Sequence, residues 1–112
     1  MAYTLKIHRN VEKQLERAPK NQRERLVATM RSLREDPRPA GCFQLDDVLY
    51  RLRQGPYRII YAVFDDDVVV VVCKVAKRAE DTYRDLETLL DRAGRALGQG
   101  SSRQGRSPSR SA

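Results

Sequence analysis

The chain has 112 residues, of which 40% are hydrophobic, enough for one small domain with a single core. It carries 22 basic and 15 acidic residues, and the resulting net charge of +7 favours a polyanionic partner such as nucleic acid, the ribosome or a membrane surface. The first residues contain no apolar signal core, and no apolar run approaches the roughly 18 residues of a membrane span. Composition therefore argues against secreted and membrane-spanning proteins, and we expect a cytoplasmic location.

Cysteine and histidine are scarce in this sequence. Cys42 and Cys73 are the two cysteines, and two thiols without a leader fit a reducing compartment, with Cys73 as a small buried hydrophobe. His8, the only histidine, is expected at the end of the first strand, as a surface residue. No cluster of His, Cys and carboxylate residues has the spacing of metal ligands, so we predict neither a metal nor another cofactor.

The first third of the chain predicts one strand and two helices. Residues 3–8 alternate apolar and polar side chains, which is typical of a strand. Asn10 offers a side-chain cap for a first helix, which Pro19 ends, and a second helix is predicted from about 21 to 35. The apolar stripe of the second helix consists of Leu26, Val27, Met30 and Leu33. The two helices form a hairpin, and the Pro- and Gly-rich segment 36–41 then returns the chain to the sheet.

Three apolar-rich runs follow, separated by turn signals at Gly55-Pro56 and at residues 65–67. They predict three consecutive antiparallel strands, and the Val-rich run 68–72 is apolar on both faces, as in a central strand. The two helices of the hairpin run in opposite directions, so the strand that follows them should run opposite to the first strand. If the first strand lies beside the Val-rich strand, the whole sheet is antiparallel.

Arginines occur on the first two of these three strands. Arg51 and Arg53 share one face because strand side chains alternate. A two-residue loop at 55–56 would place Arg58 directly opposite Arg53 and bring three guanidinium groups together. Like charges opposite each other destabilise a sheet, which indicates a polyanion ligand. The alternative is a solvated face on which arginine keeps the sheet edge soluble.

The last part of the chain predicts a helix and a tail. The helix extends from about Asp81 to Leu97, with its apolar stripe formed by Leu86, Leu89, Leu90, Ala93 and Leu97. Residues 98–112 contain no large apolar side chain, so we expect a disordered basic tail after a domain of residues 1–97. This tail is either a solubilising segment or a weak polycation that follows phosphates.

Four sequence features together resemble the RelE/ParE superfamily of bacterial toxins from type II toxin–antitoxin pairs. They are YRLR at 50–53, GPYRIIY at 55–61, KVAKR at 74–78 and Tyr83. The resemblance covers about residues 1–97 and implies an α+β fold with the element order β-α-α-β-β-β-α. We therefore expect a small antiparallel four-stranded sheet with the N-terminal helical hairpin on one face and a C-terminal helix.

The RelE branch of this superfamily implies a ribosome-dependent endoribonuclease that cleaves mRNA in the A site and is held inactive by a cognate antitoxin in a hetero-oligomer. The ParE branch implies a non-enzymatic inhibitor of DNA gyrase, and a basic RNA-binding module without activity is a third hypothesis. Carried over to this sequence, the RelE branch implies Arg58, Arg78 and Tyr83 as catalytic residues. The residues predicted to bind RNA phosphates are Arg51, Arg53, Lys74 and Lys77.

RNA can be cleaved without a metal when the neighbouring 2′-hydroxyl attacks the phosphate. The reaction needs a base, positive charge on the phosphorane and support for the leaving oxygen. Tyr83 is the candidate base and Arg78 the support for the leaving group, while Tyr83 as part of the helix stripe and Arg78 as a solvated turn residue remain alternatives. We expect the antitoxin either to cover the arginines or to displace the last helix.

Overall fold

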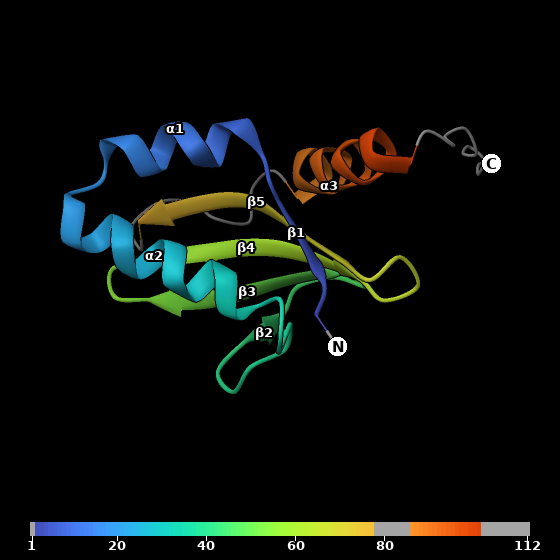
Figure 1. Ribbon diagram of the computed structural model, residues 1–112, viewed down its shortest axis with the longest axis horizontal. Helices are drawn as coiled ribbons and strands as arrows, with labels where there is room; N and C mark the ends of the chain where they lie inside the picture. Colours follow the sequence, from blue (N-terminus) through green and yellow to red (C-terminus); the bar gives the residue numbers. More distant parts are fainter. Residues whose placement is uncertain (1, 78–85, 102–112) are drawn as a thin grey trace.

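The computed structural model describes residues 2–77 and 86–101, which form a sheet with helices on both faces (Figure 1). In chain order the elements are β1 (Thr4–Ile7), α1 (Arg9–Arg17), α2 (Lys20–Ser32), β2 (Phe43–Gln44), β3 (Leu49–Gln54), β4 (Tyr57–Phe64), β5 (Val69–Lys77) and α3 (Leu86–Ser101). The α1–α2 hairpin packs on one face and α3 on the other, which confirms the α+β class. Within the described part of the chain, no helix has the length and apolar character to cross a bilayer.

The sheet has five strands in the order β1-β5-β4-β3-β2, and β1 pairs with β5 in parallel. The expectation of four strands, all antiparallel, was therefore wrong. The reason is the short strand β2, which pairs antiparallel with β3 and adds one reversal of the chain before the predicted meander begins. The helical hairpin does deliver the next strand opposite to β1, but that strand is β2, so β3 and β5 run the same way as β1.

The β3–β4 hairpin has the predicted register. Gly55 and Pro56 form a two-residue loop, so that Arg53 pairs directly with Arg58. Gly55 has a φ of 59°, a left-handed conformation that suits glycine at the first central position of a type II′ turn. The turn chemistry therefore fixes the register that aligns the arginines.

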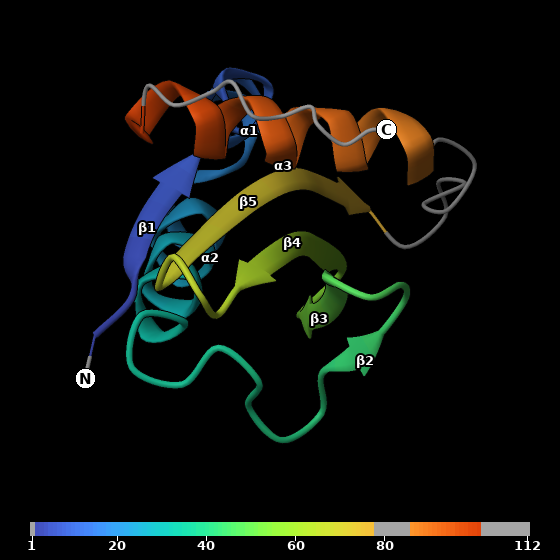
Figure 2. The ribbon, with the colours of Figure 1, turned by 90° about the vertical axis from the view of Figure 1, so that its right-hand side faces the viewer.

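Each face of the sheet has its own apolar core. Under α1 and α2 the core includes three tyrosines, Tyr50, Tyr57 and Tyr61, which lie on the opposite face from the arginines because strand side chains alternate. The buried Tyr61 hydroxyl donates a hydrogen bond of 2.7 Å to the carbonyl of Pro37. Under α3 the core is smaller and consists of Leu49, Ile60, Ala62, Val69, Val71, Cys73, Leu89 and Ala93. Figure 2 shows α3 lying along this second face, above β5.

An irregularity in β5 changes which of its side chains share a face. Ile60 pairs with Lys74 but the next residue, Tyr61, pairs with Val72, so Cys73 is an extra residue on β5. Cys73 is fully buried under α3, and burial raises the pKa of its thiol to about 12. Because of this extra residue, Lys74 lies on the same face as Cys73 instead of alternating to the opposite one.

The helix ends differ from their predictions by a few residues. The α1 cap is His8, whose ring Nδ1 accepts a hydrogen bond of 3.1 Å from the backbone N–H of Asn10, so the prediction of Asn10 as the cap was wrong. His8 can take this place because it ends β1 and precedes α1 directly. The second helix ends at Ser32, three residues before the predicted Glu35, and α3 continues past the predicted boundary at Leu97 to Ser101.

An ion pair with its neighbouring hydrogen bonds connects three segments at the end of the sheet where the β4–β5 turn lies. Arg38 binds both carboxylate oxygens of Asp65, at 2.7 and 3.2 Å, and its Nε–H donates to the hydroxyl of Tyr50 at 2.9 Å. The hydroxyl of Tyr3 donates to Asp65 at 2.8 Å. These hydrogen bonds, first from Arg38 and then from Tyr3, lower the pKa of Asp65. The N-terminal strand and the loop after α2 are thereby attached to the turn.

Candidate nucleic-acid-binding face

The predicted basic strand residues form two cross-strand rows on the sheet face that α3 partly covers. One row crosses four strands and consists of Phe43, Arg51, Ile60 and Lys74. The adjacent row consists of Arg53, Arg58 and Ala76. Residues that pair directly on neighbouring strands project from the same face, and neighbouring strands lie about 5 Å apart. We call the surface formed by Arg51, Arg53, Arg58 and Lys74 the arginine face.

Strand register places Arg53 directly opposite Arg58, so that two like charges occupy paired positions. Arg53 is exposed and Arg58 is half-buried, so one guanidinium is open to solvent while the other lies closer to the sheet. Each guanidinium offers five N–H donors and keeps its charge at any physiological pH. The pair therefore provides a fixed positive charge of the kind that binds phosphate oxygens.

Phe43 is a candidate binding residue that the sequence reasoning missed. It is 54% exposed, the one large hydrophobic side chain that is exposed among the residues described. The guanidinium of Arg51 lies over its ring, 4.9 Å from the ring centre, in a cation–π contact. An exposed aromatic ring beside arginines can stack on a nucleobase. The signal was a lone aromatic residue shortly after the Pro-containing breaker segment 36–41, but its exposure depends on β2, which was not predicted.

Lys77 was grouped with the arginines in the sequence analysis, but it lies on the other face of the sheet. It pairs with Tyr57, and its ammonium group lies 6.0 Å from the centre of the Tyr57 ring. There it borders a pocket of about 330 Å³ next to Arg17 and Pro19, at the end of α1. Alternation separates the two lysines, because they are three residues apart, and the extra residue at Cys73 decides that Lys74, not Lys77, lies on the arginine face.

Arg78 and Tyr83 fall outside the residues that the structure describes, so their predicted roles stay predictions. Lys77 is the last described residue before them and ends β5 beside the β3–β4 hairpin, at the end of the sheet where Arg53 and Arg58 lie. Among the described residues, no three His, Cys, Asp or Glu side chains come together as metal ligands would. The described chemistry of this face is therefore positive charge with one exposed aromatic ring.

The fold has a helical hairpin and a later helix on opposite faces of a small mixed sheet, and arginines pair across its β-hairpin. These features define the class as a basic α+β protein suited to a polyanionic ligand. Residues 5–82 match the family model described as the ParE toxin of the type II toxin–antitoxin system parDE. The chain belongs to the RelE/ParE superfamily of toxins from type II toxin–antitoxin systems.

Three relatives illustrate the similarity. RelE1 of Methanocaldococcus jannaschii is 28% identical over 90 residues, which are 76% of this chain and 99% of RelE1. RelE in the archaeal RelE–RelB complex from Pyrococcus horikoshii OT3 is 32% identical, with a TM-score of 0.64 over 71% of this chain and 99% of that chain. The E. coli RelBE toxin–antitoxin complex contains a chain 32% identical, with a TM-score of 0.59 over 68% of this chain and 96% of that chain.

Proposed function

We propose that this toxin is an mRNA endoribonuclease that acts in the ribosomal A site, and hence in the cytoplasm. The observation that carries the proposal is the direct pairing of Arg53 with Arg58 on the face that also holds Arg51 and Lys74. Like charges at opposed strand positions cost stability, so an anionic ligand gives a reason for their presence. The identity to RelE1 and to RelE of known structure supports the RelE branch.

Arginine is suited to the charge that develops during attack by a 2′-hydroxyl. The attack converts the phosphodiester into a phosphorane with additional negative charge, which breaks down to a 2′,3′-cyclic phosphate and a 5′-hydroxyl. A donor positioned for this charge is worth roughly 3 kcal/mol in the transition state. In this proposal Arg58 and Arg53 stabilise the phosphorane, while Arg51 and Lys74 bind the flanking phosphates.

Tyr83 and Arg78 complete the proposed reaction by resemblance to the RelE branch. Tyr83 would remove the 2′-hydroxyl proton, and neighbouring guanidinium groups would favour its phenolate despite an ordinary pKa of about 10. Arg78 would hydrogen-bond to the leaving 5′-oxygen without giving up its own proton. Such a site is weak in acid–base chemistry, so alignment of the mRNA by the ribosome supplies the remaining rate enhancement.

We also propose a cognate antitoxin as partner in a hetero-oligomer. The P. horikoshii and E. coli relatives are in complexes with RelB. On this chain, the arginine face provides charge and α3 provides an amphipathic helix beside it, which together suit an acidic antitoxin segment that folds on binding. Such a segment would neutralise the toxin by covering the arginines or by displacing α3.

Translation in a reconstituted system, followed by primer extension on the mRNA, tests the nuclease proposal. We expect cleavage in the A site by the wild type and its loss in the Arg58→Ala/Tyr83→Phe double variant. Arg25→Ala, an exposed arginine on α2, is the charge-matched control for the Arg58 change and should cleave normally. Cleavage by the double variant at the wild-type rate would refute the assignment.

The matched family model carries the name of the ParE toxin, which makes inhibition of DNA gyrase the second candidate function. A supercoiling assay with purified gyrase separates the two functions. Accumulation of cleaved gyrase–DNA complexes while the mRNA stays intact would establish the ParE-like activity in place of the nuclease.

A further inference from the structure

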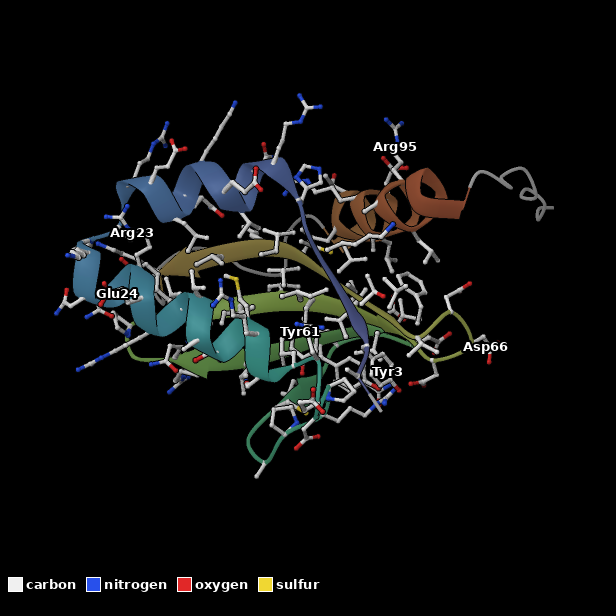
Figure 3. All side chains as sticks on the ribbon, viewed as in Figure 1. Tyr3, Arg23, Glu24, Tyr61, Asp66 and Arg95 are labelled. Carbon is white, nitrogen blue, oxygen red and sulfur yellow. The ribbon has the colours of Figure 1, made fainter. Side chains whose placement is uncertain are left out.

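A second basic site lies where the end of β1 and the start of α1 meet α3. It is a pocket of about 500 Å³ and has no residue in common with the arginine face. Its polar lining consists of Lys6, His8, Arg9, Glu12, Arg92 and Arg95. In Figure 3, Arg95 projects from α3 toward the same side of the molecule as α1. Elements that are distant in sequence thus converge to form a pocket lined mainly by cations.

Two of the cations are held in place by neutral partners. The ammonium group of Lys6 donates to the carbonyl of Ala96 at 3.1 Å, and a guanidinium nitrogen of Arg92 donates to the carbonyl of Cys73 at 3.2 Å. A carbonyl positions a cation without neutralising its charge. Lysine has three donors and arginine five, so both side chains keep donors for a ligand. The pocket is therefore pre-organised for an anion.

The described carboxylates near the pocket do not balance its charge. Glu12 lines it, and Asp91 pairs with Arg95 at 3.0 Å along α3. That pair is well exposed, with side chains 77% and 59% accessible, and is therefore screened by water. Against these two carboxylates stand the four permanent charges of Lys6, Arg9, Arg92 and Arg95. An excess of positive charge remains.

His8 lines this pocket, and its pKa responds to the charge of the neighbouring arginines. Partial burial, followed by the charges of Arg92 and Arg9, lowers the pKa of its imidazole. Its Nδ1 accepts the hydrogen bond from Asn10, so the neutral ring carries its proton on Nε2. The start of α1 adds the positive end of a helix dipole at the same place. A bound anion would offset all of these charges.

We propose that this pocket binds a phosphate group, either of a free nucleotide or of an RNA backbone outside the cleavage site. Its volume lies within the usual range of about 300–1,000 Å³ for small-molecule sites. The proposal does not depend on nuclease activity, since it rests on residues that the proposed reaction does not use. Binding of phosphate raises the pKa of His8, because a negative charge a few ångströms away favours the imidazolium form.

The test uses His8 as its own reporter. Because the chain contains one histidine, its ring protons give a single titration curve in the NMR spectrum of the full-length protein. Inorganic phosphate, AMP and a short uncleavable 2′-O-methyl RNA are each added at constant ionic strength, with sodium chloride as the reference. We expect each phosphate compound to raise the pKa of His8 by roughly one unit, the lower end of the effect of a nearby opposite charge.

Two charge-matched double variants test whether the pocket is responsible. Arg9→Gln/Arg95→Gln removes two cations from the pocket, and it should lose at least half of the shift. Lys13→Gln/Arg25→Gln removes two exposed cations elsewhere on α1 and α2, and it should retain the full shift. Circular dichroism shows whether each variant is folded, and Arg92→Gln serves as a second pocket variant if the first does not fold.

Each outcome decides the proposal. A shift equal to that in sodium chloride, or an equal loss in both double variants, would overturn it in favour of general screening. A shift that depends on the pocket variant supports it. If RNA then saturates the shift at a concentration at least tenfold below AMP, the ligand is an RNA backbone phosphate; saturation by AMP at an equal or lower concentration identifies a nucleotide.

Discussion

The two ends of the sheet use arginine in opposite ways. At the end with the β4–β5 turn, Arg38 forms two hydrogen bonds with Asp65 and a third with Tyr50. At the end with the β3–β4 hairpin, Arg53 lies directly across from a second arginine, Arg58. Figure 3 shows how far apart the two ends are, with Asp66 at one extreme of the long axis and Arg23 of α2 at the other.

This difference separates an arginine with a structural role from the arginine pair to which we assign a function. An arginine paired with a carboxylate connects loops, and its charge is neutralised within the protein. Arginines on opposed strand positions bring two like charges together, an arrangement that suits a polyanionic ligand. The acidic turn residues Asp65, Asp66 and Asp67 follow the end of β4, and Arg58 lies near its start, so the two ends of this strand carry opposite charges. In the proposed function, this separation of charge would steer the end that carries the arginines toward RNA during association.

The largest effect that would test this comparison is expected from Arg53→Gln. Cleavage should fall by about 100-fold, equivalent to roughly 3 kcal/mol of transition-state stabilisation. The free energy of unfolding should rise by about 0.5 kcal/mol, because the repulsion from Arg58 is removed. Primer extension and urea denaturation measure the two effects, and Arg25→Gln is the control. Lower stability together with unchanged cleavage would mean that Arg53 is structural, like Arg38.

A second variant, Phe43→Ala, extends the comparison to the edge of the arginine face. Affinity for a single-stranded RNA oligonucleotide should fall about 10-fold, since stacking of one base on an aromatic ring is worth about 1–3 kcal/mol. Stability should change by less than about 0.5 kcal/mol because the ring is 54% exposed. Fluorescence anisotropy measures the affinity. Phe43→Tyr should bind as the wild type does, and equal weakening in both variants would contradict stacking.

At the opposite end, Arg38→Gln should affect stability alone. It removes the ion pair with Asp65, whose side chains are 40% and 54% exposed, so the loss should be only about 1 kcal/mol. RNA cleavage should remain at the wild-type level, because Arg38 lies at the acidic end. Urea denaturation and primer extension on the same preparation provide the test. A large loss of cleavage in a folded variant would show that the two ends are not functionally separate.

The smallest expected effect is the pH dependence of the same ion pair. The pKa of Asp65 is lower in the folded protein than in the unfolded chain, so the carboxylate contributes stability above the unfolded value of about 3.9. This contribution disappears as the pH falls through the lower folded pKa. Asp65→Asn should therefore differ from the wild type at neutral pH and converge with it in acid, as measured by urea midpoints from pH 7 to pH 2. A constant difference would exclude this linkage.

Local patterns predicted much of the fold and the centre of the candidate site. The hairpin register followed from Gly55-Pro56, and it correctly placed Arg53 opposite Arg58. The stripe of α2 also followed from helical spacing, since Leu26, Met30 and Leu33 are buried. These features depend on contacts between residues close in sequence, where turn chemistry and side-chain periodicity decide the outcome.

Other features depended on pairing over long distances. The two-residue strand β2 is too short to have a periodicity of its own, yet it reverses the direction of the rest of the sheet and brings Phe43 beside Arg51. Alternation alone separates Lys74 from Lys77, but the extra residue at Cys73 decides which of the two shares the face of the arginines. A bulge depends on the partner strand, so alternation along β5 alone could not reveal it.

By itself, the sequence determined a basic chain with two helical segments, an arginine-bearing hairpin and a later amphipathic helix, because composition and spacing are local properties. Only the tertiary structure decided that β1 pairs in parallel with β5 and that His8, rather than Asn10, caps α1. It also decided that cations of β1, α1 and α3 form a common pocket. The physical reason is that strand order and the packing of distant helices are set by burial of the whole core, which no local pattern contains.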